Sequence, residues 1–224
     1  MSGDRMGITY GVQADYKKLF YSEELAALRV PITLMPGYGK LEMGTGLSRA
    51  TSASGAARLG MYLPYDPTAT ITGAEVAPGR AYLVADHTSG DFDCQVTLDN
   101  SYKFVVNDDF ILVGSGEAAE NLGKITAIDR TTYTNKAVIA FTSATGKNYT
   151  TANFAYATIE GYDTMTGILQ ETTNTGEGVN AFGGFANLII GNCVLYTGML
   201  VGNVDSAGLS DVSASTLGQY TYIR

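Results

Sequence analysis

The feature that most constrains this chain is the close, regular spacing of short β-prone segments between turns. Clusters of serine, threonine and glycine recur about every ten residues from Gly37 onward. The runs between these clusters are rich in β-branched and aromatic side chains, which favour strands. Strands are expected at residues 81–84, 94–98, 102–106, 110–113, 124–129, 137–142, 154–159, 167–171, 188–190 and 194–196. Such spacing predicts a β-barrel or β-sandwich and not a parallel sheet with crossover helices.

Helix signals are few and gather near the N-terminus. Ser22 is a suitable N-cap, Glu23-Glu24 suits the positive end of a helix dipole, and Pro31 would stop the helix. The segment 22–29 therefore predicts a short helix, which residues 14–21 can extend because their apolar side chains share one helical face.

Three other segments have local signatures. Asn107-Asp108-Asp109, between two apolar runs, predicts a hairpin turn. Residues 117–121 are expected to form a single helical turn, and residues 172–184 a flexible link. Residues 1–13 have the pattern of an extended arm.

The charge balance argues against two classes of partner. A net charge of −8 and a pI near 4.6 disfavour nucleic acid, which needs a basic stripe to neutralise phosphates. An apolar run of about 18 residues, as a membrane span requires, does not occur in the sequence. Residues 1–62 carry a net charge of +2 and the remaining residues a net charge of −10. This asymmetry fits an N-terminal part that contacts an acidic surface, and chance variation explains it equally well.

The last part of the chain has an unusually uncharged composition. Residues 161–224 contain eleven glycines, one basic residue and five acidic residues. A monomeric domain with so little surface charge would be poorly soluble. We therefore expect part of this region to be an interface within an oligomer or shell.

The residue types needed for nucleophilic or zinc chemistry are nearly absent. The chain has a single histidine, His87, in a segment that reads as a turn, so we expect it at a turn or on the surface. Cys94 and Cys193 lie in apolar or neutral surroundings, which predicts buried free thiols. No metal site and no cofactor are expected.

The remaining candidates for chemistry are equally weak. Residues 37–40, Gly-Tyr-Gly-Lys, lack the other elements of a phosphate-binding loop and read as a turn. Asp99, Asp108, Asp109, Glu117 and Glu120 lie near turns, but no aromatic-lined cleft around them can be read from the sequence. The sequence therefore predicts that the protein is not an enzyme.

Four short blocks of the sequence share a glycine-centred pattern. The first pair is 41–47, Leu-Glu-Met-Gly-Thr-Gly-Leu, and 60–66, Gly-Met-Tyr-Leu-Pro-Tyr-Asp. The second pair is 166–170, Thr-Gly-Ile-Leu-Gln, and 186–191, Ala-Asn-Leu-Ile-Ile-Gly. These blocks resemble the head-decoration (capsid cement) proteins of tailed bacteriophages. The resemblance covers about half of the chain in glycine-centred segments.

This resemblance implies a fold and an organisation. It implies a compact β-barrel or β-sandwich core formed by residues 37–71 together with 163–224. Residues 72–162 would be an inserted small β-barrel domain, and residues 1–36 an N-terminal arm with a short helix.

The resemblance also implies a function. It implies a homotrimer on the outer surface of a phage capsid, assembled in the host cytoplasm, with the major capsid protein as partner and neither nucleic acid nor membrane. Candidate capsid-binding anchors are aromatic and apolar residues of the arm, because such side chains dominate interface hot spots. They are Tyr10, Tyr16, Leu19 and Phe20. Packing of these residues on the protein's own barrel is an equally good explanation.

Two other classes of function stay open. One is a different virion component, namely a tail-tube, major coat or head-fibre protein. A tail tube would need long paired strands, whereas the middle of this chain is dense in turns. The other class is a non-viral binding or adhesion module.

Overall fold

The computed structural model describes residues 20–22, 28–51, 58–66, 77–114, 117–191, 193–196, 200–201 and 220–223. Strands dominate this part of the chain, and its only α-helix has four residues. Two larger sheets form most of the body, and two smaller sheets flank them.

The first larger sheet is a closed five-stranded barrel with the strand order β12-β14-β2-β5-β4. Most neighbours pair antiparallel, but β2 and β5 meet in parallel at Leu34 and Tyr62. Its strands are β2 (Leu28–Leu34), β4 (Gly46–Arg49), β5 (Tyr62–Pro64), β12 (Met165–Leu169) and β14 (Gly184–Gly191).

The second larger sheet has six antiparallel strands in the order β6-β11-β8-β9-β10-β7. A bridge between Leu83 and Val96 links its two edges, so this sheet is a nearly closed barrel. Its strands are β6 (Ala81–Tyr82), β7 (Asp93–Thr97), β8 (Asp109–Gly114), β9 (Glu117–Asp129), β10 (Lys136–Phe141) and β11 (Tyr156–Ile159).

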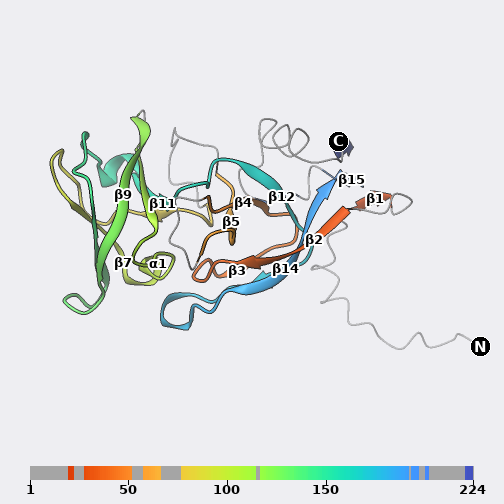
Figure 1. Ribbon diagram of the computed structural model, residues 1–224, viewed down its shortest axis with the longest axis horizontal. Helices are drawn as coiled ribbons and strands as arrows, with labels where there is room; N and C mark the ends of the chain where they lie inside the picture. Colours follow the sequence, from red (N-terminus) through yellow and green to blue (C-terminus); the bar gives the residue numbers. More distant parts are fainter. Residues whose placement is uncertain are drawn as a thin grey trace, which may run out of the picture.

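The smaller elements lie beside these barrels. One sheet has the order β1-β15-β16 and another pairs β13 with β3. Figure 1 shows the six-stranded barrel at one end, the five-stranded barrel in the middle and β1 with β15 at the other end. The remaining elements are β1 (Phe20–Ser22), β3 (Lys40–Leu41), α1 (Leu98–Ser101), η2 (Thr151–Asn153), β13 (Thr173–Asn174), η3 (Gly178–Asn180), β15 (Cys193–Tyr196) and β16 (Tyr220–Ile223).

Side-chain patterning explains the strands of the six-stranded barrel. In β10, Ala137, Ile139 and Phe141 are buried while the residues between them are only partly buried. This period of two is that of a strand with one face toward the core. All six residues of β8 are buried, which fits a continuous apolar run covered on both faces.

Strand β9 changes partner along its length, which allows the sheet to curve. Its first part pairs with β8 up to Lys124, and its last part pairs with β10 from Ile125 onward. Gly123 lies at this change with φ +75°, a conformation that glycine adopts without a Cβ clash. Irregular register next to it fits the bulges with which strands bend around a barrel.

One hydrophobic core spans both barrels. Buried residues of the five-stranded barrel, such as Leu34 and Leu188, belong to the same cluster as Val96 and Phe141 of the six-stranded barrel. Phe104 and Phe110 extend the cluster with an edge-to-face contact at 5.4 Å between ring centroids. The two barrels therefore bury apolar side chains against each other in one shared core.

The helix predicted at residues 22–29 is wrong at both of its ends. Ser22 closes strand β1, and residues 28–29 open strand β2; the residues between lie outside the described part. Strand β2 is paired along its length with β14, and this ladder overrides the local capping signal. Residues 28–34, expected in the arm, are thus a barrel strand.

Two further local predictions are wrong. Residues 102–106 are not a strand, because the N–H groups of Tyr102, Lys103 and Phe104 donate to carbonyls three residues back and continue the turn of α1. Residues 117–121, expected as a helical turn, belong to β9 and pair with β8. A single isolated turn of helix is costly to nucleate, whereas a strand here completes a ladder.

The predicted mainly β fold with two barrels is confirmed. All strands of the six-stranded barrel lie between residues 81 and 159, and those of the five-stranded barrel lie on either side in the sequence. How the chain divides into independently folding domains stays a prediction. Within the described residues, no helix is long and apolar enough to cross a membrane.

Candidate interaction surface and barrel junction

The predicted capsid-binding anchors fall at the edge of what the structure describes. Tyr10, Tyr16 and Leu19 lie outside the described residues. Phe20 is the first residue of β1, where it pairs with Leu195 of β15. The role of these four residues as anchors stays a prediction.

His87 was expected at a turn or on the surface, but it is buried. It forms a bridge with Tyr149, and its Nε2 lies 3.1 Å from Thr145 Oγ1. Its ring packs edge-on against Phe141, with 6.0 Å between ring centroids. Burial lowers the pKa of His87, and the nearby carboxylate of Asp91 acts in the opposite direction. These contacts give it a structural role.

The acidic residues of the predicted hairpin turn are engaged with basic side chains. Asp108 is fully buried and accepts a hydrogen bond of 2.6 Å from Arg58 Nη1. Asp109 accepts a hydrogen bond from Lys124 Nζ. Among the described residues, no group of three or more His, Cys, Asp or Glu side chains could hold a metal ion.

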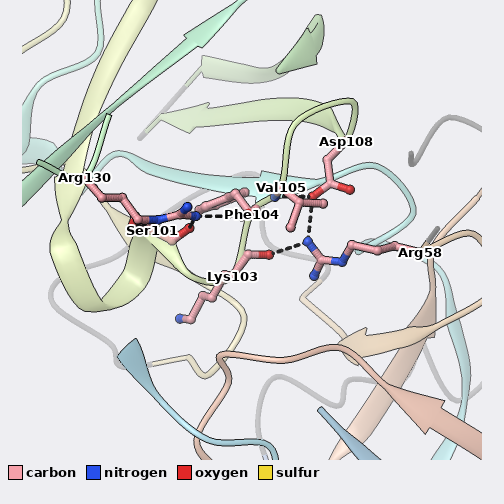
Figure 2. A network of polar contacts seen from close by, with 7 residues as sticks. All are labelled: Arg58, Ser101, Lys103, Phe104, Val105, Asp108 and Arg130. Atoms are coloured by element: carbon pink, nitrogen blue, oxygen red, sulfur yellow. Dashed lines mark hydrogen bonds and ion pairs between the residues drawn. The ribbon is translucent and has the colours of Figure 1, made fainter. Parts of the chain in front are cut away.

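Basic side chains hold the segment 98–108 in place at the junction of the barrels, as Figure 2 shows. Arg130 donates to Ser101 Oγ and to the carbonyls of Ser101 and Phe104, at 2.8–2.9 Å. Arg58 donates to the carbonyl of Lys103 at 2.8 Å. These charge-assisted hydrogen bonds add to the backbone bonds of the turn, since the Ser101 carbonyl also accepts from the N–H of Phe104.

Lys103 is the least expected member of this junction. Only 6% of the residue is exposed, and Nζ donates to the carbonyls of Pro78 and Arg80 at 2.9 Å each. Nζ also lies 5.4 Å from the ring centroid of Tyr38. Burial lowers the pKa of Lys103 to about 8, against the opposing effect of the Glu177 carboxylate.

The most exposed large apolar side chains gather in one stretch of the chain. Phe185 is 85% exposed, Val179 75% and Phe182 68%. We call residues 179–185, which comprise the end of η3, residues 181–183 and the first two residues of β14, the apolar loop. Aromatic side chains are enriched at protein interfaces, so this loop is the candidate interaction surface.

Buried Thr175 pins the base of the apolar loop. Its Oγ1 accepts from the N–H of Tyr38 and donates to the carbonyl of Gly39. Its own carbonyl accepts from the N–H groups of Phe182 and Gly183, at 3.1 and 3.2 Å. A loop fixed in this way presents its aromatic side chains with little conformational entropy left to lose on binding.

Comparisons of the chain with protein families, with curated proteins and with solved structures found no match.

Neither the apolar loop nor Lys103 was identified from the sequence. Residues 172–184 were expected to be a flexible link, and residues 102–106 a strand. A usable signal was present in the loop, because Phe182 and Phe185 flank a pair of glycines in an otherwise polar segment. Aromatic residues in such a segment are expected to be exposed in the free protein, and exposed apolar side chains often mark a surface that a partner covers.

Proposed function

We propose that this chain is a virion structural protein that binds the outer surface of a phage capsid as a trimeric decoration (cement) protein and stabilises the shell. The observation that carries the proposal is the apolar loop, whose exposed aromatic side chains stand on a base fixed by Thr175. The compact two-barrel body supports the same role, since a cement protein works as a rigid block.

Binding alone would account for the stabilisation. A specific interface buries about 1,600 Å² in total, and a protein that bridges capsomers adds this area across each joint. Internal pressure must then break more contacts before the shell opens. Three linked copies at one symmetry axis raise the effective concentration of each binding surface.

The proposed partner is the major capsid protein, and the proposed location is the capsid surface of the virion. Low charge content, 16% of residues, supports a chain whose surface is partly covered by other protein chains. The acidic net charge of −8 is unfavourable for direct contact with packaged nucleic acid.

Titration of expanded, undecorated shells with the purified protein tests the proposal. Saturation at a copy number equal to the threefold or hexamer positions of the shell is expected. Binding to tails alone would contradict decoration and favour a tail component. Light scattering of the free protein shows whether the trimer exists before docking.

The double variant Phe182→Ser, Phe185→Ser tests the apolar loop itself. We expect it to weaken shell binding at least about tenfold, because hot-spot aromatic residues dominate interface energies. Phe92→Ser is the matched control, since Phe92 is 56% exposed but precedes β7 in the other barrel. Equal binding by the double variant and the control would exclude the loop as the docking surface.

Deletion of residues 1–19 tests the predicted anchors separately and leaves strand β1 intact. Loss of shell binding with an unchanged unfolding temperature is expected if the arm carries anchors. Full affinity of the shortened chain would remove Tyr10, Tyr16 and Leu19 from the interface.

A further inference from the structure

A cavity of about 330 Å³ lies beside the segment that the basic side chains hold. Strand β6, helix α1 and the loops around them line it, with Tyr38, Arg80, Tyr82, Asp99, Asn100, Lys103 and Glu177. Ligand pockets in proteins measure about 300–1,000 Å³, so this one is of a size for a single small molecule.

Tyr38 and Tyr82 form the aromatic part of the lining. The hydroxyl of Tyr82 accepts a hydrogen bond from Arg80 Nη1 at 3.4 Å, and its ring meets Tyr156 edge-on. Tyr38 is buried, and its N–H donates to Thr175 Oγ1. The negative face of such a ring attracts the weakly positive C–H groups of a ligand.

The charges of the lining are arranged by depth. On the buried side are Lys103 and Arg80, which are 6% and 2% exposed. On the exposed side are the carboxylates of Asp99 and Glu177. Arg80 is already neutralised by a two-pronged ion pair with Asp66, at 2.6 and 3.2 Å.

This arrangement selects against charged ligands of either sign. A cation that entered deeply would meet Lys103, whose ammonium group is desolvated. An anion would have to pass the carboxylates of Asp99 and Glu177. An uncharged ligand with many polar groups meets neither obstacle.

The hydrogen-bonding capacity of the lining is mixed in the same way. Lys103 retains one N–H proton after its two bonds to backbone carbonyls. Asn100 offers both a donor and an acceptor, and the carboxylates of Asp99 and Glu177 accept. A ring that carries several hydroxyl groups matches this set, since each hydroxyl both donates and accepts.

Two glycines lie next to the carboxylates of the lining. A Cβ at Gly178 would lie 2.5 Å from Asp99 Oδ1, so a larger residue there would displace this carboxylate. A Cβ at Gly39 would collide with Glu177 Oε1. Both glycines have positive φ, +51° and +66°, which other residues rarely adopt.

We propose that this cavity binds one uncharged sugar ring, with Tyr82 against a C–H face and Asp99, Glu177, Asn100 and Lys103 on its hydroxyl groups. The proposal goes beyond capsid decoration and does not depend on it. The cavity could bind a saccharide whether or not the protein binds a capsid shell.

The test uses the full chain on an array of immobilised neutral, acidic and amino saccharides, followed by calorimetry with free monosaccharides. Binding of neutral sugars is expected, both as free rings and as terminal residues of longer chains. Detection of acidic or amino sugars alone would overturn the proposal, as would no binding at about 10 mM ligand.

Variants locate the binding. Asp99→Asn and Glu177→Gln are each expected to weaken it about tenfold, because each removes a charge-assisted hydrogen bond. Glu171→Gln is the matched control, an exposed carboxylate that does not line the cavity. Saccharide affinity that is unchanged in both cavity variants would place the sugar elsewhere and contradict the proposal. Thermal unfolding of each variant separates a lost ligand contact from a lost fold.

Discussion

At the scale of single residues, four buried charged side chains of this protein form two ion pairs. Asp108 and Arg58 are 0% and 5% exposed in their side chains, and Arg80 and Asp66 form a second buried pair. Removing a charge from water is costly, and only a close, hydrogen-bonded partner offsets that cost. The two pairs therefore fix one arrangement of the junction.

Asp108→Asn should lower the free energy of unfolding by about 3 kcal/mol, because the variant leaves Arg58 buried without a counter-charge. Urea unfolding followed by circular dichroism measures this change. Asp163→Asn, at an exposed position, serves as the control and should stay within about 0.5 kcal/mol of the original protein. A similarly small change for Asp108→Asn would mean that the pair contributes little.

Lys103 makes the stability depend on pH in the alkaline range. Its pKa is lowered from 10.5 to about 8, so between these values the folded chain binds fewer protons than the unfolded chain. The free energy of unfolding therefore rises as the pH increases from about 8 to 10.5. The stability gained in this way is fully present above pH 10.5 and is lost as the pH falls to about 8.

The measurable quantity is the stability difference between the original protein and Lys103→Met. We expect this difference to shift in favour of the original protein as the pH rises from about 8 to 10. Urea unfolding at several pH values gives it, and titration of Cys94 and of the tyrosines cancels because both proteins contain them. A difference that is constant with pH would show that Lys103 keeps its ordinary pKa.

At the scale of elements, Thr175 joins two pieces of chain that are distant in the sequence. It connects the turn at Tyr38 and Gly39 with the apolar loop and with strand β13. The bonds to Tyr38 and Gly39 use the Thr175 hydroxyl group, whereas the bonds to the apolar loop use the Thr175 backbone carbonyl. Sequence patterning cannot indicate such a contact, because its partners lie about 136 residues away.

Thr175→Val should destabilise the protein by about 2 kcal/mol, since the N–H of buried Tyr38 loses its acceptor while the side-chain volume is kept. Hydrogen exchange should also speed up at the N–H of Tyr38, whereas the N–H groups of Phe182 and Gly183 keep the Thr175 carbonyl as acceptor. The control is Thr173→Val, whose hydroxyl makes only an exposed bond to Glu171. Unchanged exchange at Tyr38 in the Thr175 variant would contradict the role of the hydroxyl group in holding the turn at residues 38–39.

At the scale of the whole molecule, the shared core predicts that the two barrels unfold together. Buried residues from Ile32 to Leu188 form one cluster that includes strands of both barrels. Loss of either barrel would expose apolar surface of the other, which couples their stabilities.

We therefore expect a single calorimetric transition whose van't Hoff and calorimetric enthalpies agree. Circular dichroism and tyrosine fluorescence should give the same midpoint. Two separate transitions would show that the six-stranded barrel is an independent unit.

Much of the strand pattern could be predicted from the sequence. The runs at 110–113, 137–142 and 154–159 became β8, β10 and β11, because their apolar periodicity survives in any β architecture. The helix predicted at 22–29 was wrong because pairing of β2 with β14 outweighs the local helix signal. The strand predicted at 102–106 was wrong because this segment continues the turn of α1, which Arg130 holds.

The sequence by itself determined the mainly β class, since frequent turns and β-branched runs leave no length for helices or crossovers. Only the tertiary structure decided which strands close into which barrel, that Lys103 is buried, and that Tyr38, Asp99 and Glu177 line one cavity. These are contacts between residues far apart in the chain, and hydrophobic periodicity specifies which face is buried but not what is buried against it.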